Sequence, residues 1–355
     1  MPEFVYEALP MRVRFAWGAL EHLAAEMDHL GLRRVLVLAT PEQKELAVAV
    51  ADALGERAAG VFAEARMHVP VELASRAREE AHRLAADGCL AVGGGSTIGL
   101  GKAVALDSGL PIIAVPTTYA GSEMTPIWGL TENGEKRTGR DSRVLPAAVV
   151  YDPALTTSLP TSLSVTSAVN AMAHAVEALY APDASPVISL MAEEGVRALT
   201  NALPGIVVDG SSRQPRETAL YGAWLCGACL GATTMSLHHK ICHSLGGSLD
   251  LPHAPSHTVV LPHVLAFNQA AAPGMRRAVA RALDTTGDPA RRLWDLLREW
   301  GAPTSLRELG MPRADISLVA GQVLAKPYTN PRPVTDSDLR GLITRAWSGE
   351  PPAPG

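Results

Sequence analysis

Short apolar runs alternate with helix-period patterns over the first 150 residues, and this alternation constrains the fold more than any other feature. The runs are rich in Val, Ile and Leu without polar alternation, which is typical of strands buried on both faces. They lie at residues 34–40, 61–70, 89–92 and 110–116, and another follows a polar segment before residue 151. Helical patterns separate them, most clearly at residues 71–88. The alternation predicts a Rossmann-like α/β domain, a parallel sheet covered by helices on both faces.

The loop GGGSTIGLGK, residues 93–102, follows one of these strands. Ligands of parallel sheets bind beyond the carboxyl ends of the strands. Gly93, Gly94 and Gly95 let the backbone approach a ligand closely, and we expect Ser96 or Thr97 to cap the next helix, whose N-terminus favours a phosphate. The pattern is neither a Walker loop nor a strict GxGxxG. A tight turn without a ligand is the alternative interpretation.

A second loop, PTTYAGSEMT at residues 116–125, carries hydroxyl groups to the end of the next strand. The two loops together favour a dinucleotide. The first strand ends in Ala39-Thr40-Pro41, where no acidic residue would repel a 2′-phosphate, so we expect NADH, NADPH or both. The predicted cofactor contacts are Thr40, Gly93, Gly94, Gly95, Ser96, Thr97, Thr117, Thr118, Ser122 and Lys136.

Lys136 belongs to a hairpin-like polar segment that also carries Arg137, Arg140 and Arg143. This segment is equally consistent with a solvated turn and with a positive charge that reaches the cofactor or an anionic substrate.

After Pro160 every apolar pattern has helical period. The chain therefore divides into a dinucleotide-binding α/β domain, residues 1–159, and an all-helical substrate and catalytic domain, residues 160–355.

Six of the eleven histidines lie between His238 and His263. On a helix, His239 and His243 share one face. We expect the following SLGG to end that helix and His253 to lie in a Pro-bounded loop that folds back toward the same face. Asn170 and His174 have the same spacing on an earlier helix. A lone histidine there would be a core residue, but the converging imidazoles indicate a metal site, an acid/base site or an anion pocket.

Composition narrows the possible partners. Of the 355 residues, 47% are hydrophobic and 19% charged, and the net charge of -5 gives no reason to expect nucleic-acid binding. The N-terminus lacks the pattern of a secretory signal, and no apolar run approaches the ~18 residues of a membrane helix. We therefore expect a cytoplasmic protein without membrane or nucleic-acid partners.

The four cysteines, two with CxxC spacing, are interpreted as packed thiols rather than a redox or zinc pair.

Several motifs in one order resemble the iron-containing (group III) alcohol dehydrogenase family. That family has a GGGS turn, a PTTxGTGSE-like loop, a DxxxH helix, a second histidine helix, and a PHG loop before LLPHVxxxN. This chain has GGGSTIGLGK, PTTYAGSEMT, NAMAHAVEA, HHKICHSLGG, LPHAPSH and VVLPHVLAFN. The likeness runs from about Arg12 to the NPRPV segment at residues 330–334. It implies the fold of that family and of the related dehydroquinate synthases.

The resemblance implies that the metal positions of the family correspond to Asn170, His174, His239 and His253. The family's aspartate is Asn170 in this sequence, so a neutral amide replaces the only anionic ligand, which should cost much of the affinity for a divalent cation. We therefore expect no metal, with these four positions vestigial. NAMAHAVEALYA and TGRDSRVLP resemble the branch of the family that reduces maleylacetate without a metal.

For that branch, the resemblance implies NAD(P)H-dependent reduction of the conjugated C=C bond of maleylacetate and substituted maleylacetates to 3-oxoadipate, in aromatic-compound degradation, by a homodimer. The product charge would appear as an enolate that hydrogen bonds stabilise, so imidazoles could replace a Lewis acid. We predict His243 as the proton donor or enolate stabiliser. His239, His253 and His174 would shape a cationic pocket for the dicarboxylate, with the nicotinamide arriving across the domain cleft. The predicted substrate contacts are Asn170, His174, His239, His243, His253 and Arg332.

Arg332 lies in KPYTNPRPVTDSDLR, where a structural turn is favoured over a carboxylate contact.

Three other functions compete with the reduction of maleylacetate. A metal-dependent alcohol dehydrogenase of the same family would hold iron or zinc. A dehydroquinate-synthase-like lyase would need a complete metal triad and a basic phosphate site, which the sequence lacks. A non-catalytic nucleotide-binding regulator would leave the histidines unexplained.

Overall fold

A computed structural model describes residues 4, 6, 8–9, 11–132 and 135–354. Contacts divide the chain into two compact units, residues 8–159 and residues 160–355, the latter together with the described residues ahead of Glu7. All strands of the described chain lie in the first unit. The α/β fold class and the all-helical second half predicted from the sequence are confirmed.

The first unit contains a six-stranded sheet in which every paired strand is parallel, in the order β1-β8-β5-β4-β2-β3. Its strands are β1 (Arg12–Phe15), β2 (Val35–Leu38), β3 (Ala58–Phe62), β4 (Gly88–Gly93), β5 (Ile112–Pro116) and β8 (Ala148–Tyr151). β6 (Ile127–Glu132) and β7 (Glu135–Arg140) form a separate antiparallel hairpin. β1 was not predicted, because four half-exposed residues with two arginines do not read as a buried strand.

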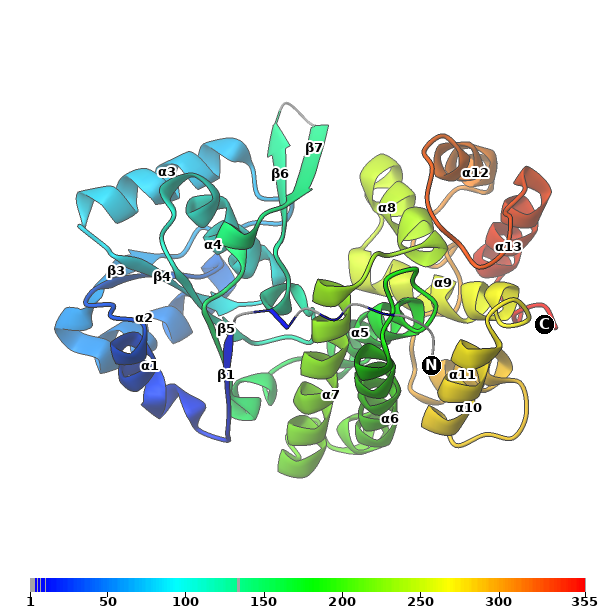
Figure 1. Cartoon of the computed structure of the whole chain (residues 1–355), viewed down its shortest axis with the longest axis horizontal. Helices are drawn as coiled ribbons and strands as arrows, with labels where there is room; N and C mark the ends of the chain where they lie inside the picture. Colours follow the sequence, from blue (N-terminus) through cyan, green and yellow to red (C-terminus); the bar gives the residue numbers. More distant parts are fainter. Residues whose placement is uncertain (1–3, 5, 7, 10, 133–134, 355) are drawn as a thin grey trace. The chain divides into compact units, whose positions relative to one another are not determined.

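Alternate residues of each central strand face opposite helix layers. Val35 and Val37 of β2 pack with α1 (Leu23–His29) and α2 (Lys44–Leu54), whereas Leu36 and Leu38 pack with α3 (Val71–Arg83) and α4 (Gly95–Ser108). The two layers are visible on the two sides of the sheet (Figure 1). The continuous apolar strands of the sequence are therefore explained by burial on both faces.

The second unit is built of helices. Its first three, α5 (Thr161–Ala178), α6 (Pro186–Val208) and α7 (Arg213–Ala232), pack side by side. The others are α8 (Leu237–Leu249), α9 (His253–Asn268), α10 (Pro273–Ala282), α11 (Pro289–Glu299), α12 (Ile316–Leu324) and α13 (Asp336–Ser348). A buried cluster of apolar residues joins α8, α9, α12 and α13.

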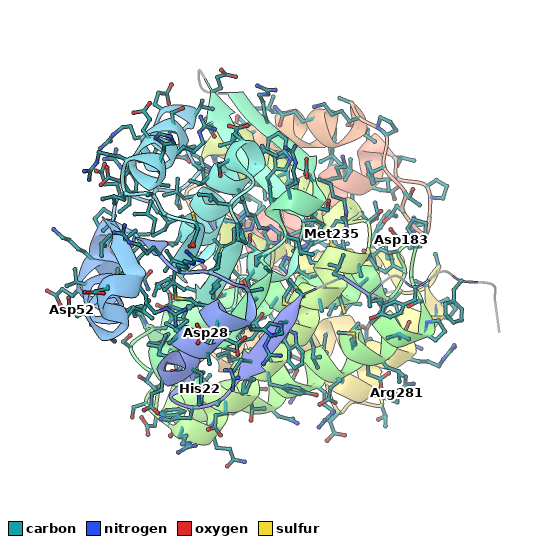
Figure 2. The ribbon with its side chains drawn as sticks, turned by 60° about the vertical axis from the view of Figure 1, so that its left-hand side comes forward. His22, Asp28, Asp52, Asp183, Met235 and Arg281 are labelled. Atoms are coloured by element: carbon teal, nitrogen blue, oxygen red, sulfur yellow. The ribbon has the colours of Figure 1, made fainter. Side chains whose placement is uncertain are left out.

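The connection between α7 and α8 is fixed by Asp183, whose carboxylate accepts the Thr234 N–H at 3.0 Å and the Thr234 hydroxyl at 2.8 Å. Asp183 and the neighbouring Met235 can be followed in Figure 2. The connection matters for the site because it leads directly into the helix that carries three histidines.

No single helix of the described chain is long and apolar enough to cross a membrane. The pair α7 and α8 would meet the criterion together by length and composition, but it bends by 95°. The four cysteines are free and buried, which confirms the interpretation as packed thiols.

Candidate active site

The glycine turn lies at the carboxyl edge of the sheet of the first unit, between β4 and α4. Gly93 has φ of 156°, and a Cβ there would lie 2.3 Å from Thr97 Oγ1. Only glycine fits this position. The first intrahelical bond runs from Ile98 N to Gly94 O, so the preceding amides of α4 have no partner within the helix and can bind an anion.

The expected cap by Ser96 or Thr97 is wrong. α4 begins at Gly95, its N-cap residue is Gly94, and no side chain caps it. Ser96 and Thr97 lie inside the first turn because the extended Gly94 already turns the chain into the helix. An uncapped N-terminus beside a glycine turn fits the phosphates of a dinucleotide better than a capped one would.

The ends of three consecutive strands of the sheet, β5, β4 and β2, are tied together beside this turn. Gln43, which follows β2, donates from Nε2 to Thr117 Oγ1 at 2.7 Å, and Thr117 N donates to Gly93 O at 3.1 Å. The predicted cofactor residues Gly93, Thr97 and Thr117 thus meet at one corner. Gln43 was not predicted, since nothing in a surface-type sequence such as PEQKE marks an inward-facing amide.

A buried lysine organises the second predicted loop. Lys102 of α4 is 1% exposed and donates from Nζ to Ser122 O at 2.6 Å, Thr125 Oγ1 at 2.8 Å and Ile127 O at 2.8 Å. Burial lowers its pKa to about 7, although Glu123 opposes this shift. The lysine thereby holds the loop that carries Thr118 and Ser122.

An acidic side chain does lie at the end of β2. The backbone amide of Glu42 and the Thr40 hydroxyl lower the pKa of the exposed Glu42 carboxyl by hydrogen bonding. The expectation that nothing at this strand end repels a phosphate therefore overlooked Glu42, which directly follows Ala39-Thr40-Pro41. The side chain of Lys136 lies outside the described residues. Arg137 pairs with Glu132 and Arg143 with Asp141.

In the second unit, Asn170, His174 and Glu177 lie on one face of α5, at spacings of four and three residues. All three are buried. Glu177 was not predicted, and its position one turn beyond His174 in NAMAHAVEA was the signal that could have found it. Their burial is the setting of a site rather than of a solvated surface.

α8 and α9 differ from the prediction. α8 continues through Ser244–Gly247 to Leu249 and ends where Asp250 takes the left-handed conformation with φ of 51°. The glycines do not end it because Leu237, Ile241 and Leu245 anchor one helical face in the core. His253 is not in a loop: it is the first residue of α9, and the prolines at 252 and 255 are tolerated at the start of a helix.

The structure brings the predicted histidines together around His239. Its ring lies 5.2 Å from His174 and 6.0 Å from His243, centroid to centroid. Two further histidines, not predicted, complete the cluster: His238 at 5.3 Å and His257 at 5.0 Å from His239. His253 joins through His257, at 4.2 Å. His243 and His253 are exposed, whereas the other four are buried.

Burial and the neighbouring imidazoles keep the inner histidines neutral. Desolvation first, and repulsion from the other rings second, lower the pKa of His174, His239 and His257 well below 6.5. Desolvation lowers the pKa of His238 to about 4. A cationic pocket formed by His174 and His239, as predicted, is therefore not favoured.

The residues at the family's metal positions fit a divalent cation poorly. Asn170 Oδ1 and His174 Nδ1 are buried without a protein partner, so donor atoms are present. However, the set consists of one amide and three imidazoles, and none of these carries the negative charge that the family's aspartate would supply. His238, His239 and His257 also place ring nitrogens within 4.8 Å of one another, again without an anionic member.

Arg332 is engaged in structural contacts. Its guanidinium lies 4.0 Å from the Phe267 ring centroid and 3.5 Å from Asp338. The adjacent Asn330 exchanges two 2.9 Å hydrogen bonds with Asn268. This agrees with the structural-turn interpretation of the segment.

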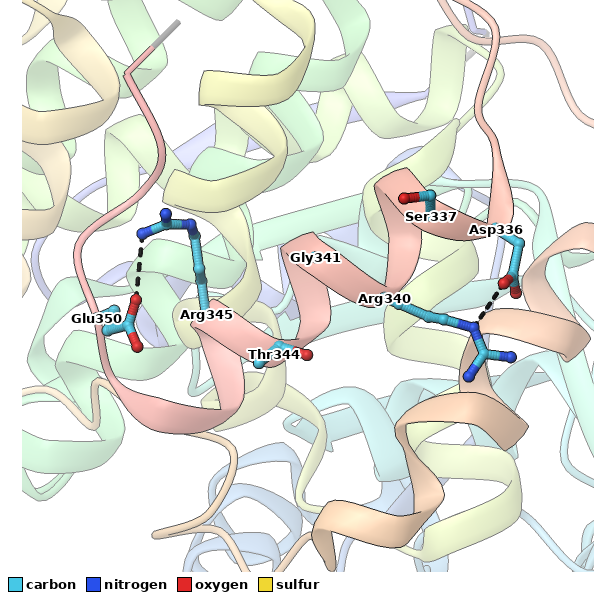
Figure 3. A pocket seen from close by; sticks show the side chains of 7 residues that line it. All are labelled: Asp336, Ser337, Arg340, Gly341, Thr344, Arg345 and Glu350. Carbon is cyan, nitrogen blue, oxygen red and sulfur yellow. Dashed lines mark hydrogen bonds and ion pairs between the residues drawn. The ribbon is translucent and has the colours of Figure 1, made fainter.

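A hollow on α13 contains none of the predicted residues. Its cations are already paired, Arg340 with Asp336 and Arg345 with Glu350 (Figure 3). The histidine cluster and the glycine turn remain the two candidate functional regions.

Comparisons with known proteins cover both halves of the chain. The model of the family described as iron-containing alcohol dehydrogenase matches residues 10–153, and that of the Fe-containing alcohol dehydrogenase family, C-terminal, matches residues 164–347. The chain is 56% identical over 353 residues to a maleylacetate reductase of Burkholderia cepacia, covering 99% of this chain and 100% of that protein. A maleylacetate reductase of Sphingobium indicum is 51% identical over 350 residues, covering 99% of each.

The crystal structure of maleylacetate reductase from Rhizobium sp. strain MTP-10005 superposes with a TM-score of 0.96 at 50% identity, covering 99% of this chain and all of that one. Both halves of the chain match the same family in the order that the motifs indicate. The chain therefore belongs to the iron-containing alcohol dehydrogenase family.

Proposed function

We propose that this protein uses NADH or NADPH to reduce the conjugated C=C bond of maleylacetate, giving 3-oxoadipate. The observation that carries the proposal is the 56% identity over the full chain to a maleylacetate reductase. The chain is an NAD(P)H-dependent oxidoreductase of its family. Asn170 at the position of the metal-binding aspartate supports a reaction that needs no Lewis acid.

The first unit supplies the dinucleotide site. The amides at the start of α4 and the turn at Gly93 are suited to the pyrophosphate, and Thr117 and Ser122 offer hydroxyl groups from the adjacent loop. A reduced nicotinamide supplies the hydride when bound. The hydrogen bond from Lys102 Nζ to the carbonyl oxygen of Ser122 holds the loop around Ser122 in place.

The second unit supplies hydrogen bonds and a proton. Reduction of the conjugated bond places negative charge on the ketone oxygen as an enolate, which donors aimed at that oxygen stabilise. His243 is exposed and lies one turn after His239, so it is the proton donor of this proposal. His253 is the other exposed imidazole and can form a hydrogen bond with a carboxylate of the substrate.

The same proposal includes five further properties of the protein. They are activity on substituted maleylacetates, a role in aromatic-compound degradation, a homodimeric state, a cytoplasmic location and metal independence. The curated relatives that carry the name maleylacetate reductase support the substrate class. The missing anionic ligand at position 170 supports the metal independence.

The test is the loss of NADH absorbance on addition of maleylacetate, with and without prior treatment with a chelator. We expect turnover that the chelator leaves unchanged. No turnover of maleylacetate, with turnover of simple aldehydes, would move the assignment to an alcohol dehydrogenase.

A metal-dependent reaction is the second candidate. The buried Asn170 Oδ1 and His174 Nδ1 without protein partners favour it. Loss of activity on chelation, restored by zinc or ferrous iron, would establish it and overturn metal independence.

A further inference from the structure

Glu177 is a fully buried carboxylate held by four hydrogen bonds. Oε2 accepts from Ser236 N at 2.8 Å and faces His239 Nδ1 at 2.7 Å, while Oε1 accepts from His238 N at 2.7 Å and from the Tyr180 hydroxyl at 3.1 Å. Three of these partners lie about 60 residues away along the chain. Burial raises the pKa of the Glu177 carboxyl, while His238 and the backbone N–H groups of Ser236 and His238 oppose that shift by stabilising the ionised form.

The carboxylate replaces a helix cap. Ser236 is the N-cap residue of α8, yet its side chain makes no capping bond. The Ser236 hydroxyl instead donates to Thr329 O at 2.5 Å. Glu177, from a different helix, accepts the N–H of His238 in the first turn and its negative charge complements the helix dipole. The start of α8 is thereby anchored to α5.

The same oxygen that accepts from Ser236 also orients the His239 ring. Because a carboxylate only accepts, His239 carries its proton on Nδ1, and the lone pair of Nε2 points away from Glu177. The other rings of the cluster surround that ring, with His174 and His257 at 5.2 and 5.0 Å. A neutral His239 therefore offers an acceptor at Nε2, and donation of a proton belongs to another imidazole.

We propose that Glu177 is a positioning residue that fixes the tautomer and ring orientation of His239. His239 then accepts a hydrogen bond at Nε2, while His243 donates the proton. The inference rests on the proposed function for its catalytic consequence, but its structural content does not. It assigns His239 a tautomer and a hydrogen-bond partner that the sequence alone could not give.

The test compares Glu177→Gln with the parent protein at full length. When the glutamine amide nitrogen takes the place of Oε2, it donates to His239 Nδ1, and the ring then carries its proton on Nε2. Two-bond 1H–15N correlation spectra of histidine-labelled protein should show Nδ1–H for His239 in the parent and Nε2–H in the variant. We expect kcat to fall 10- to 100-fold with KM for NADH within about twofold, as for other outer partners of functional histidines.

Tyr180→Phe is the matched control, because it removes one hydrogen bond from the same carboxylate without touching His239. Its kcat should stay within about threefold of the parent. A second control is His239→Asn: once His239 is absent, adding Glu177→Gln should lower kcat no further. Independent, multiplicative losses would mean that Glu177 does not act through His239.

The outcomes separate the two proposals. A parent spectrum with Nε2–H for His239 overturns the positioning role even if Glu177→Gln does not fold, because it needs no variant. Equal kcat losses in Glu177→Gln and Tyr180→Phe overturn it as well. A parent that shows the Nδ1–H tautomer but does not turn over maleylacetate contradicts the proposed function and leaves the assigned geometry intact.

Discussion

At the scale of one residue, the neutral side chain of Asn170 leaves the histidine cluster without an anionic metal ligand. Asn170 is buried with an unpartnered Oδ1, so an aspartate there would face His174 on the same helix face. We expect Asn170→Asp to bind zinc or ferrous iron at least about tenfold more tightly, since it restores an anionic ligand beside neutral imidazoles. Metal content after dialysis and calorimetric titration with zinc measure this.

The control for that change is Asn201→Asp, which adds the same charge at an exposed position of α6. It should leave metal binding at the level of the parent. Equal metal content in Asn170→Asp and the parent would show that the carboxylate is not what the site lacks.

Glu42 gives a prediction about cofactor choice. Its carboxylate is exposed at the end of β2, next to Gln43, which contacts the glycine-turn corner through Thr117. An acid at such a strand end repels the 2′-phosphate of NADPH. We expect Glu42→Gln to raise the ratio of kcat/KM for NADPH over NADH about tenfold.

Glu45→Gln, a neighbouring exposed position on α2, should leave that ratio unchanged. An unchanged ratio in Glu42→Gln would place Glu42 outside the cofactor site. Fluorescence titration with NADPH separates a binding effect from an effect on turnover.

At the scale of elements, Arg216 joins the helices that carry the site. It is 0% exposed on α7 and donates from Nε to Gly210 O and from one terminal nitrogen to Ser164 Oγ of α5, each at 2.7 Å. Removing it leaves buried acceptors without a donor. We expect Arg216→Met to lower the free energy of unfolding by about 3 kcal/mol.

Arg213 on the same helix provides the comparison. It forms an exposed pair with Glu217, so Arg213→Met should change the free energy of unfolding by less than about 0.5 kcal/mol. Urea unfolding curves measure both variants. A loss at Arg216 as small as that at Arg213 would mean that water replaces its hydrogen bonds.

At the scale of the whole molecule, buried neutral histidines make stability depend on pH. Burial lowers the pKa of His263 to about 4, and the repulsion of Arg345 adds to this shift. The unfolded chain binds a proton at His263 near pH 6.5, whereas the folded chain does not until about pH 4. The contribution of this residue to the free energy of unfolding therefore falls as the pH drops from 6.5 toward 4.

The variant His263→Phe isolates that contribution. Between pH 7.5 and 5.0, the parent should lose about 2 kcal/mol more of its free energy of unfolding than the variant does. Urea unfolding at the two pH values measures the difference. Parallel losses would show that His263 titrates alike in both states.

Much of the fold was predictable because it depends on local pattern. Short apolar runs without alternation are typical of strands buried on both faces, and Val35–Leu38 shows why, because successive residues contact opposite helix layers. Helical period after Pro160 likewise identified the second unit. The strand β1 was missed, because four residues with two arginines become a strand only by pairing with β8, far along the chain.

The site was predictable only as a set of histidines. Helical spacing grouped His239 with His243, and the family resemblance added His174 and His253 to that group. GGGSTIG at a strand end indicated a dinucleotide loop. Only the tertiary structure decided that α8 continues through two glycines, because the core contacts of Leu245 outweigh their low helix propensity. It alone placed Glu177 against His239, since a hydrogen bond across 62 residues leaves no periodic trace in a sequence.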